Sequence, residues 1–169
     1  AGLGSLFVTA TKKGAEFAKE LSGLKAVLGA SDSEMQQLSS SAKELGASTQ
    51  FTAKEVVGLQ TEFAKLGFTT KEILKSTKAT LDLAASLDVG LAEAASIAGS
   101  TLRAFGLEAE ETQRVVDVMA ASTSKSALDY DSLRESLKLV APTARAMNVD
   151  IEETTALLAT LADNGLKGS

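Results

Sequence analysis

The chain of 169 residues contains no cysteine, no histidine and no tryptophan. Without cysteine, it can form neither disulfide bonds nor thiolate metal sites. Without histidine, it lacks the commonest general base and metal ligand, which removes most arrangements of side chains that hydrolases use. We therefore expect no catalytic residues, no cofactor and no metal site.

Proline and aromatic residues are also scarce, since the chain has one proline, Pro142, and only 4% aromatic residues. Hydrophobic residues make up 44% of the chain, and alanine and leucine supply most of them. These residue types favour helices, and small side chains let helices approach closely. The composition therefore predicts an all-α fold.

Positive charge is not in excess, because 17 Lys and Arg stand against 22 Asp and Glu, for a formal net charge of −5. A protein dedicated to nucleic acid needs a basic surface that displaces counterions from phosphates. The charge therefore argues against a specific nucleic-acid partner. The apolar residues 1–10 are far fewer than the roughly 20 needed to span a bilayer, so we expect the first turns of a packed helix there.

The first 28 residues carry an apolar or small residue at alternating steps of four and three. This is the a/d spacing of a heptad repeat, which favours a left-handed coiled-coil contact. Weak members of the seam suggest that the helix needs a partner, either the rest of the domain or another chain. We predict a self-association seam formed by Leu3, Phe7, Ala10, Gly14, Phe17, Leu21, Leu24 and Leu28.

A helix-stop signal follows this seam. Gly29 suits the end of a helix, and Ser31 with Glu34 forms a capping-box pattern that starts the next. We predict two helices, at about 3–28 and 32–45, with one long helix as the alternative. The same break divides the chain into an N-terminal heptad helix at 1–30 and a helical core domain at 31–169.

A short connector recurs along the rest of the chain. It ends a helix on an apolar residue, turns on Gly, Asp or Asn, and inserts one apolar residue. With breaks at Gly46 and near Ser126, the turns lie about 18–22 residues apart, which suggests one helix per unit and an irregular array or bundle of seven to eight short helices rather than a solenoid. The connectors are Leu66-Gly67-Phe68-Thr69, Leu87-Asp88-Val89-Gly90, Phe105-Gly106-Leu107-Glu108 and Met147-Asn148-Val149-Asp150.

Acidic residues cluster just after these turns. Asp129 with Asp131, and Asn148 with Asp150, have the spacing of a calcium loop, but the glutamate that such a loop needs at position twelve is missing. Carboxylates in the first turn of a helix complement its dipole and cap its free N–H groups. We therefore predict helix capping, rather than acid–base catalysis, for these residues and for Glu108, Glu110, Glu111, Glu152 and Glu153.

Pro142 lies inside a helical pattern. It either kinks the helix and shapes a binding groove, or places its missing hydrogen bond on a solvent-facing or partner-facing side. The sequence leaves both readings open.

The most distinctive motifs lie in the second half of the chain. They are the turn Arg-Ala-Phe-Gly-Leu (103–107), the helix pattern Leu-x-x-Val-x-Pro (137–142), the stretch Glu-Glu-Thr (152–154) and the closing Ala-Asp-x-Gly-x-x-Gly-Ser (162–169). With them, residues 24–169 resemble the conserved core region of bacteriophage tail tape-measure (minor tail) proteins.

That resemblance implies a structural protein without catalytic residues, and a longer polypeptide of which this chain is a part. Such a protein sets tail length, templates assembly of the tail tube, and is ejected to assist genome delivery. It also implies parallel, trimer-like copies in the tube lumen of the virion tail, present in the host cytoplasm during assembly. The implied partners are the tail tube protein, tail assembly chaperones, tail-tip or baseplate hub proteins and, on ejection, the host envelope.

An alternative class of function fits the same helical pattern. The chain could serve as a helical protein-binding module of a bacterial secreted protein or a contractile injection system.

Overall fold

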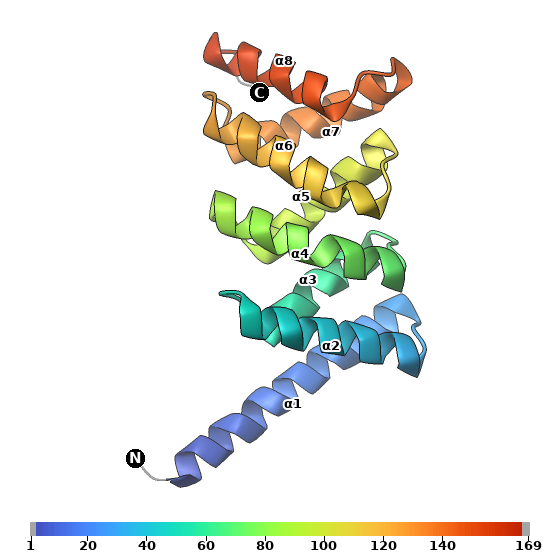
Figure 1. Ribbon diagram of the computed structural model, residues 1–169, viewed down its shortest axis with the longest axis vertical. Helices are drawn as coiled ribbons and strands as arrows, with labels where there is room; N and C mark the ends of the chain where they lie inside the picture. Colours follow the sequence, from blue (N-terminus) through green and yellow to red (C-terminus); the bar gives the residue numbers. More distant parts are fainter. Residues whose placement is uncertain (1–2, 167–169) are drawn as a thin grey trace. The chain divides into compact units, whose positions relative to one another are not determined.

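The structure is a computed structural model that describes the backbone of residues 3–166 and the side chains of residues 12–166. Within this range the chain forms eight α-helices and one short 3-10 helix, with no β-strand (Figure 1). The predicted all-α fold is confirmed. The helices are α1 (Leu3–Leu28), α2 (Asp32–Ser48), α3 (Ala53–Lys65), α4 (Thr70–Leu87), α5 (Leu91–Phe105), α6 (Thr112–Ser124), α7 (Tyr130–Ala146) and α8 (Ile151–Asp163), with the 3-10 helix η1 (Ala109–Glu111) before α6.

The helices belong to two compact units, residues 1–77 and 78–169. Unit 1 contains α1 to α3 and the start of α4, and unit 2 contains the rest. The sequence-based division between 1–30 and 31–169 stays a prediction.

The break between α1 and α2 follows the two-helix reading. Gly29 has a φ of 64°, which ends α1, and Ser31 forms a capping box with Glu34 that starts α2. The far end of α2 differs from the prediction, because the helix runs through Gly46 to Ser48. A Cβ added at Gly46 would clash with the backbone nitrogen of Ala53. This glycine therefore allows the end of α2 to approach the start of α3, and it is not the predicted helix stop.

Four turns share one design. Gly29, Gly67, Gly106 and Asn148 have positive φ values of 64°, 79°, 70° and 57°, the left-handed conformation that ends many helices. In each turn an apolar residue follows, then a residue that caps the next helix, and three positions later a glutamate. Asp88 also has a positive φ of 53°, but the cap that follows it, Gly90, has no side chain to cap α5.

The four turns lie 38, 39 and 42 positions apart, so the repeating element is a pair of helices. This corrects the expected spacing of one helix per unit. Each pair, two helices joined by such a turn, is a helical hairpin: α1–α2, α3–α4, α5–α6 and α7–α8. The one-helix reading counted Gly46, Asp88 and a break near Ser126 as turns of the same kind, although Gly46 lies inside a helix and no side-chain cap follows Asp88.

In unit 1, α1 and α2 both pack against α3. Phe63 of α3 is fully buried, and its ring centroid lies 4.9 Å from that of Phe68 in the following turn. Gln60 is also buried, and its Nε2 donates a hydrogen bond to the carbonyl oxygen of Leu38, 3.3 Å away. This bond joins α3 to α2.

In unit 2, corresponding helices of successive hairpins pack together, α5 against α7 and α6 against α8. Helix α5 contributes three fully buried alanines, Ala94, Ala95 and Ala98. Pro142 is exposed, and α7 continues past it to Ala146. The hydrogen bond that proline removes therefore falls on an exposed side of a continuous helix.

Candidate functional site

The predicted self-association seam follows one side of α1. The side chains of Leu3, Phe7 and Ala10 lie outside the described residues. Of the others, Gly14 is exposed, Phe17, Leu21 and Leu28 are half-buried, and Leu24 is fully buried. Since α1 packs against α3, the C-terminal half of the stripe contributes to the core of unit 1. Its role between chains stays a prediction.

Two lysines contact α1 residues at or beside this stripe and join them to the rest of unit 1. The Nζ atom of Lys43 lies 5.6 Å from the centroid of the Phe17 ring, a cation–π distance. The Nζ atom of Lys54 on α3 donates to a carboxylate oxygen of Glu16 at 3.1 Å, and this bond lowers the pKa of Glu16. The part of the seam that remains open around Gly14 is therefore bordered by charged groups.

Caps are confirmed at three of the predicted acidic residues. Asp129 accepts a hydrogen bond from the backbone nitrogen of Ser132, and Asp150 accepts one from that of Glu153, both at 2.8 Å. The Glu111 carboxylate accepts from the backbone nitrogen of Glu108 at 3.2 Å. These carboxylates are used to start helices, as the sequence indicated.

Glu152 has a different role, in a contact between two helices. Its two carboxylate oxygens accept from Nε and from a terminal nitrogen of Arg114, at 2.6 and 2.7 Å. Arg114 also donates to Glu111 at 2.8 Å. The paired hydrogen bonds lower the pKa of Glu152 and raise that of Arg114. Glu152 therefore joins α8 to α6, a contact between residues 38 positions apart that no local pattern indicated.

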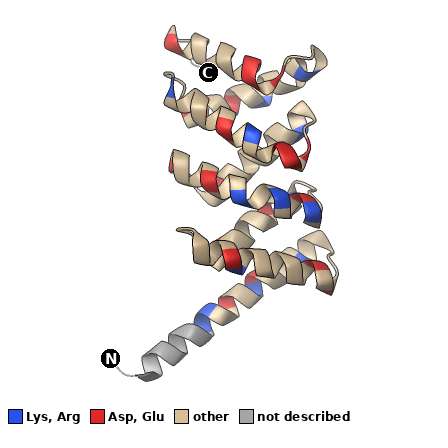
Figure 2. Cartoon of the chain, viewed as in Figure 1, with Lys and Arg blue, Asp and Glu red and all other residues tan. Residues whose placement is uncertain are grey.

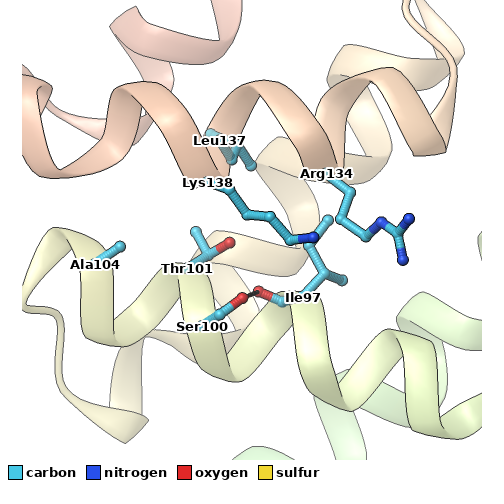
Figure 3. Close-up of a pocket in the computed structure, with 7 residues that line it drawn as sticks. All are labelled: Ile97, Ser100, Thr101, Ala104, Arg134, Leu137 and Lys138. Atoms are coloured by element: carbon cyan, nitrogen blue, oxygen red, sulfur yellow. Dashed lines mark hydrogen bonds between the residues drawn. The ribbon is translucent and has the colours of Figure 1, made fainter.

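A hollow of about 180 Å³ lies between α5 and α7 (Figure 3). Lys138 extends from α7 toward Ile97 on α5, while the guanidinium of Arg134 points to one side. Lys138 donates to Glu135 at 3.0 Å, and Arg134 lies 3.2 Å from the same carboxylate. Both cations are thus paired with a carboxylate of their own helix, and the hydroxyl of Ser100, which also lines the hollow, donates to the carbonyl oxygen of Ile97.

Other chemistry is equally absent from the part of the chain that the structure describes. It contains no group of three or more acidic residues placed to hold a metal ion. Each of α1 to α7 carries both basic and acidic residues, whereas α8 carries only acidic ones (Figure 2). None of the described helices combines the length and the apolar character needed to cross a bilayer. Within each unit the described residues form packed helices with caps and surface ion pairs.

Comparison with known proteins identifies the family. Residues 39–169 match the model of the phage-related minor tail protein. This chain belongs to the phage-related minor tail protein family. The resemblance drawn from the motifs is thereby confirmed.

Individual members of the minor tail protein family match nearly the whole chain. It is 37% identical over 158 residues to a tape measure protein of Pneumococcus phage Dp-1, an alignment that covers 94% of this chain and 14% of the relative. It is 35% identical over 158 residues to a probable tape measure protein of Escherichia phage P2, covering 92% of this chain and 19% of the relative.

A probable tape measure protein of Clostridium phage phiCD119 is 27% identical over 161 residues, covering 92% of this chain and 17% of the relative. The chain therefore spans between 14% and 19% of the length of these relatives. No solved structure matches the chain.

Proposed function

We propose that this chain is part of a tail tape-measure protein, which sets tail length, templates assembly of the tail tube and is ejected to assist genome delivery. The observation that carries the proposal is the family match over residues 39–169, together with relatives that are named tape measure proteins. The described residues supply stacked helical hairpins and no catalytic arrangement, which supports a structural role without enzyme activity.

The proposed partners follow from that role. They are the tail tube protein, the tail assembly chaperones and the tail-tip or baseplate hub proteins, with the host envelope contacted on ejection. The proposed location is the tube lumen of the virion tail, after a stage in the host cytoplasm during assembly. Basic and acidic residues are mixed on α1 to α7, and α8 is acidic (Figure 2), which supports a function without a specific nucleic-acid partner.

A deletion in the phage or prophage that encodes the chain tests the ruler function. Removal of residues 107–148 joins Gly106 to Val149, so a left-handed turn residue is still followed by an apolar residue and a helix cap. An extended helix rises about 1.5 Å per residue, so loss of this segment shortens the tail by about 60 Å if the segment is extended in the tube. If the hairpins stay stacked, the tail shortens by only about 10 Å, the usual distance between packed helices.

Electron microscopy of negatively stained tails measures both outcomes. Tandem duplication of residues 107–148 is the matched control, and it lengthens the tail by the same amount. Tails of unchanged length in both variants, with normal assembly, contradict the ruler function of this segment and favour a helical module that only binds another protein.

Parallel copies of the chain are the second part of the proposal, with the seam of α1 as their contact. Leu24 is unsuitable as a test site because it is buried within unit 1. Gly14 is suitable, since a Cβ added there meets no atom of the chain within 4 Å. We expect Gly14→Glu to abolish self-association, because it places a charge in the seam, while the chain stays folded.

Gly23→Glu is the matched control for this substitution. Gly23 also lies on α1, is exposed and has no atom within 4 Å of an added Cβ, but it is not a seam position. Both changes replace a helical glycine and gain the same backbone stability. Light scattering gives the mass of each variant. Equal masses for the two variants contradict a seam at this stripe.

A further inference from the structure

The last hairpin, α7–α8, exposes large apolar side chains. Leu139 and Met147 are 76% and 69% exposed, and Leu157 and Leu161 are 58% and 45% exposed. They lie at helical spacing along one stripe of each helix, and no charged residue occurs at positions 139–144 or 154–162. An exposed apolar face of this kind usually marks a place where another element binds.

The preceding hairpin, α5–α6, has the same design 42 positions earlier. Residues 102–113 and 144–155 align without a gap through the left-handed turn and share Arg, Ala, Glu, Glu and Thr at five positions. By this alignment, Leu139, Met147, Leu157 and Leu161 correspond to Ile97, Phe105, Val115 and Met119. These four equivalents are 2%, 8%, 0% and 0% exposed. The same face is thus buried in one hairpin and open in the next.

The structure shows what buries the face of α5–α6. Ile97 and Thr101 of α5 line the contact with Leu137 and Lys138 of α7 (Figure 3), and α6 packs against α8. The α5–α6 face is therefore covered by the following hairpin. In α7 the residues equivalent to Ile97 and Thr101, which are Leu139 and Thr143, are exposed.

We propose that the α7–α8 face is a docking surface for a further helical hairpin of the same repeat, carried by the same polypeptide. The aligned relatives are long enough to supply one, since this chain spans only 14–19% of their length. The inference rests on the hairpin repeat and does not depend on the tail function.

A second copy of the chain is the competing occupant, and the geometry disfavours it. The α5–α6 and α7–α8 turns lie on the same side of unit 2 (Figure 1), so α5 and α7 run in the same direction. A two-fold axis in the plane of this face either reverses the direction of the helices or exchanges the places of α7 and α8, so a two-fold related copy cannot place a parallel helix over both α7 and α8 as a following hairpin does. The face therefore matches the hairpin contact rather than a symmetric dimer.

The experiment uses single cysteines, because the chain has none. Leu157→Cys reports on the face, and Lys125→Cys, in an exposed loop, is the control. Thiol labelling rates are measured in two proteins, the 1–169 chain and a longer chain in which a second copy of residues 125–166 follows residue 166. In the longer chain the cysteine lies in the first copy, at its original position. The added hairpin should slow labelling at position 157 at least tenfold and leave labelling at position 125 unchanged.

Substitutions in the added copy alone show whether it docks as a repeat. Leu137→Asp there alters the side that meets the preceding hairpin, and it should restore fast labelling. Leu139→Asp there alters the outward side, and it should leave the protection intact. Circular dichroism, which follows the helical content of the added segment, shows that the added hairpin has formed.

Two outcomes overturn the proposal. The first is equal labelling of the Leu157→Cys variant with and without the added hairpin, which shows that the face does not accept a repeat. The second is protection of the same cysteine in the 1–169 chain that increases with protein concentration, which shows that a second copy covers the face.

Discussion

Units 1 and 2 use the same turn between paired helices, yet they pack their helices differently. Unit 1 buries large side chains, among them Phe63, Phe68 and Leu59. Unit 2 buries large aliphatic side chains as well, but its helix α5 also buries the alanines Ala95 and Ala98 completely, and the Arg114–Glu152 ion pair joins α6 to α8. The turn is therefore common to both units, whereas the aromatic pair belongs to unit 1 and the buried alanines of α5 belong to unit 2.

This difference predicts opposite sensitivities at Phe63 of unit 1 and at Ala98 of unit 2. A site filled by a large side chain is vulnerable to loss of volume, because a cavity remains where atoms were removed. A site filled by a small side chain is vulnerable to added volume, because the helices must move apart. Substitutions in each direction can therefore test the comparison.

The largest expected effect is in unit 1. We expect Phe63→Ala to lower the free energy of unfolding by about 3–5 kcal/mol, since it leaves a cavity and removes the contact with Phe68. Phe51→Ala is the matched control, because Phe51 is only half-buried, and it should cost clearly less. Hydrogen exchange of the α3 amides measures the loss. Equal costs for the two substitutions show that Phe63 does not hold the core of unit 1.

A smaller effect is expected from added volume in unit 2. Ala98→Leu should cost about 1–3 kcal/mol, because Ala98 is 0% exposed and the added atoms force α5 away from its neighbours. Ala92→Leu, at an exposed position of the same helix, is the control, and it should be nearly neutral. Urea denaturation followed by circular dichroism compares the two. An Ala98→Leu variant as stable as the control contradicts close packing in unit 2.

Much of this fold could be predicted because its signals are local. The capping box at Ser31 and Glu34 and the left-handed positions at Gly67, Gly106 and Asn148 mark helix ends within a few residues. Gly46 misled the prediction because a glycine that permits close approach looks, in sequence, like one that ends a helix.

The contacts between helices were not predictable in this way. Arg114 and Glu152 are 38 positions apart, and Glu152 has the same local pattern as a helix cap. The sequence alone also does not show that this face is buried in the third hairpin and exposed in the fourth, since Val115 and Leu157 are both apolar. Local chemistry determines where helices start and stop, whereas the partners that cover their faces depend on the fold.

The smallest expected effect concerns the ion pairs that join helices in each unit. Arg114 bonds Glu152 through two hydrogen bonds, whereas Lys54 bonds Glu16 through one. Both side chains of the Arg114–Glu152 pair stay more than 40% exposed, so water screens it and Glu152→Gln should cost only about 0.5 kcal/mol. Glu16→Gln should cost less, because a single bond is lost.

The pH dependence of the destabilisation by Glu152→Gln shows whether it arises from the lost charge or from altered packing. Hydrogen bonds from Arg114 lower the pKa of Glu152 in the folded chain, so the pair stabilises the fold above the unfolded pKa of about 4.3. That stability is lost as the pH falls through the lower folded pKa, where glutamate becomes protonated. The difference in the free energy of unfolding between the natural chain and Glu152→Gln, measured by urea denaturation, should therefore be largest at pH 7 and vanish in strong acid. A difference that persists in acid assigns the cost to packing of α8 on α6 rather than to charge.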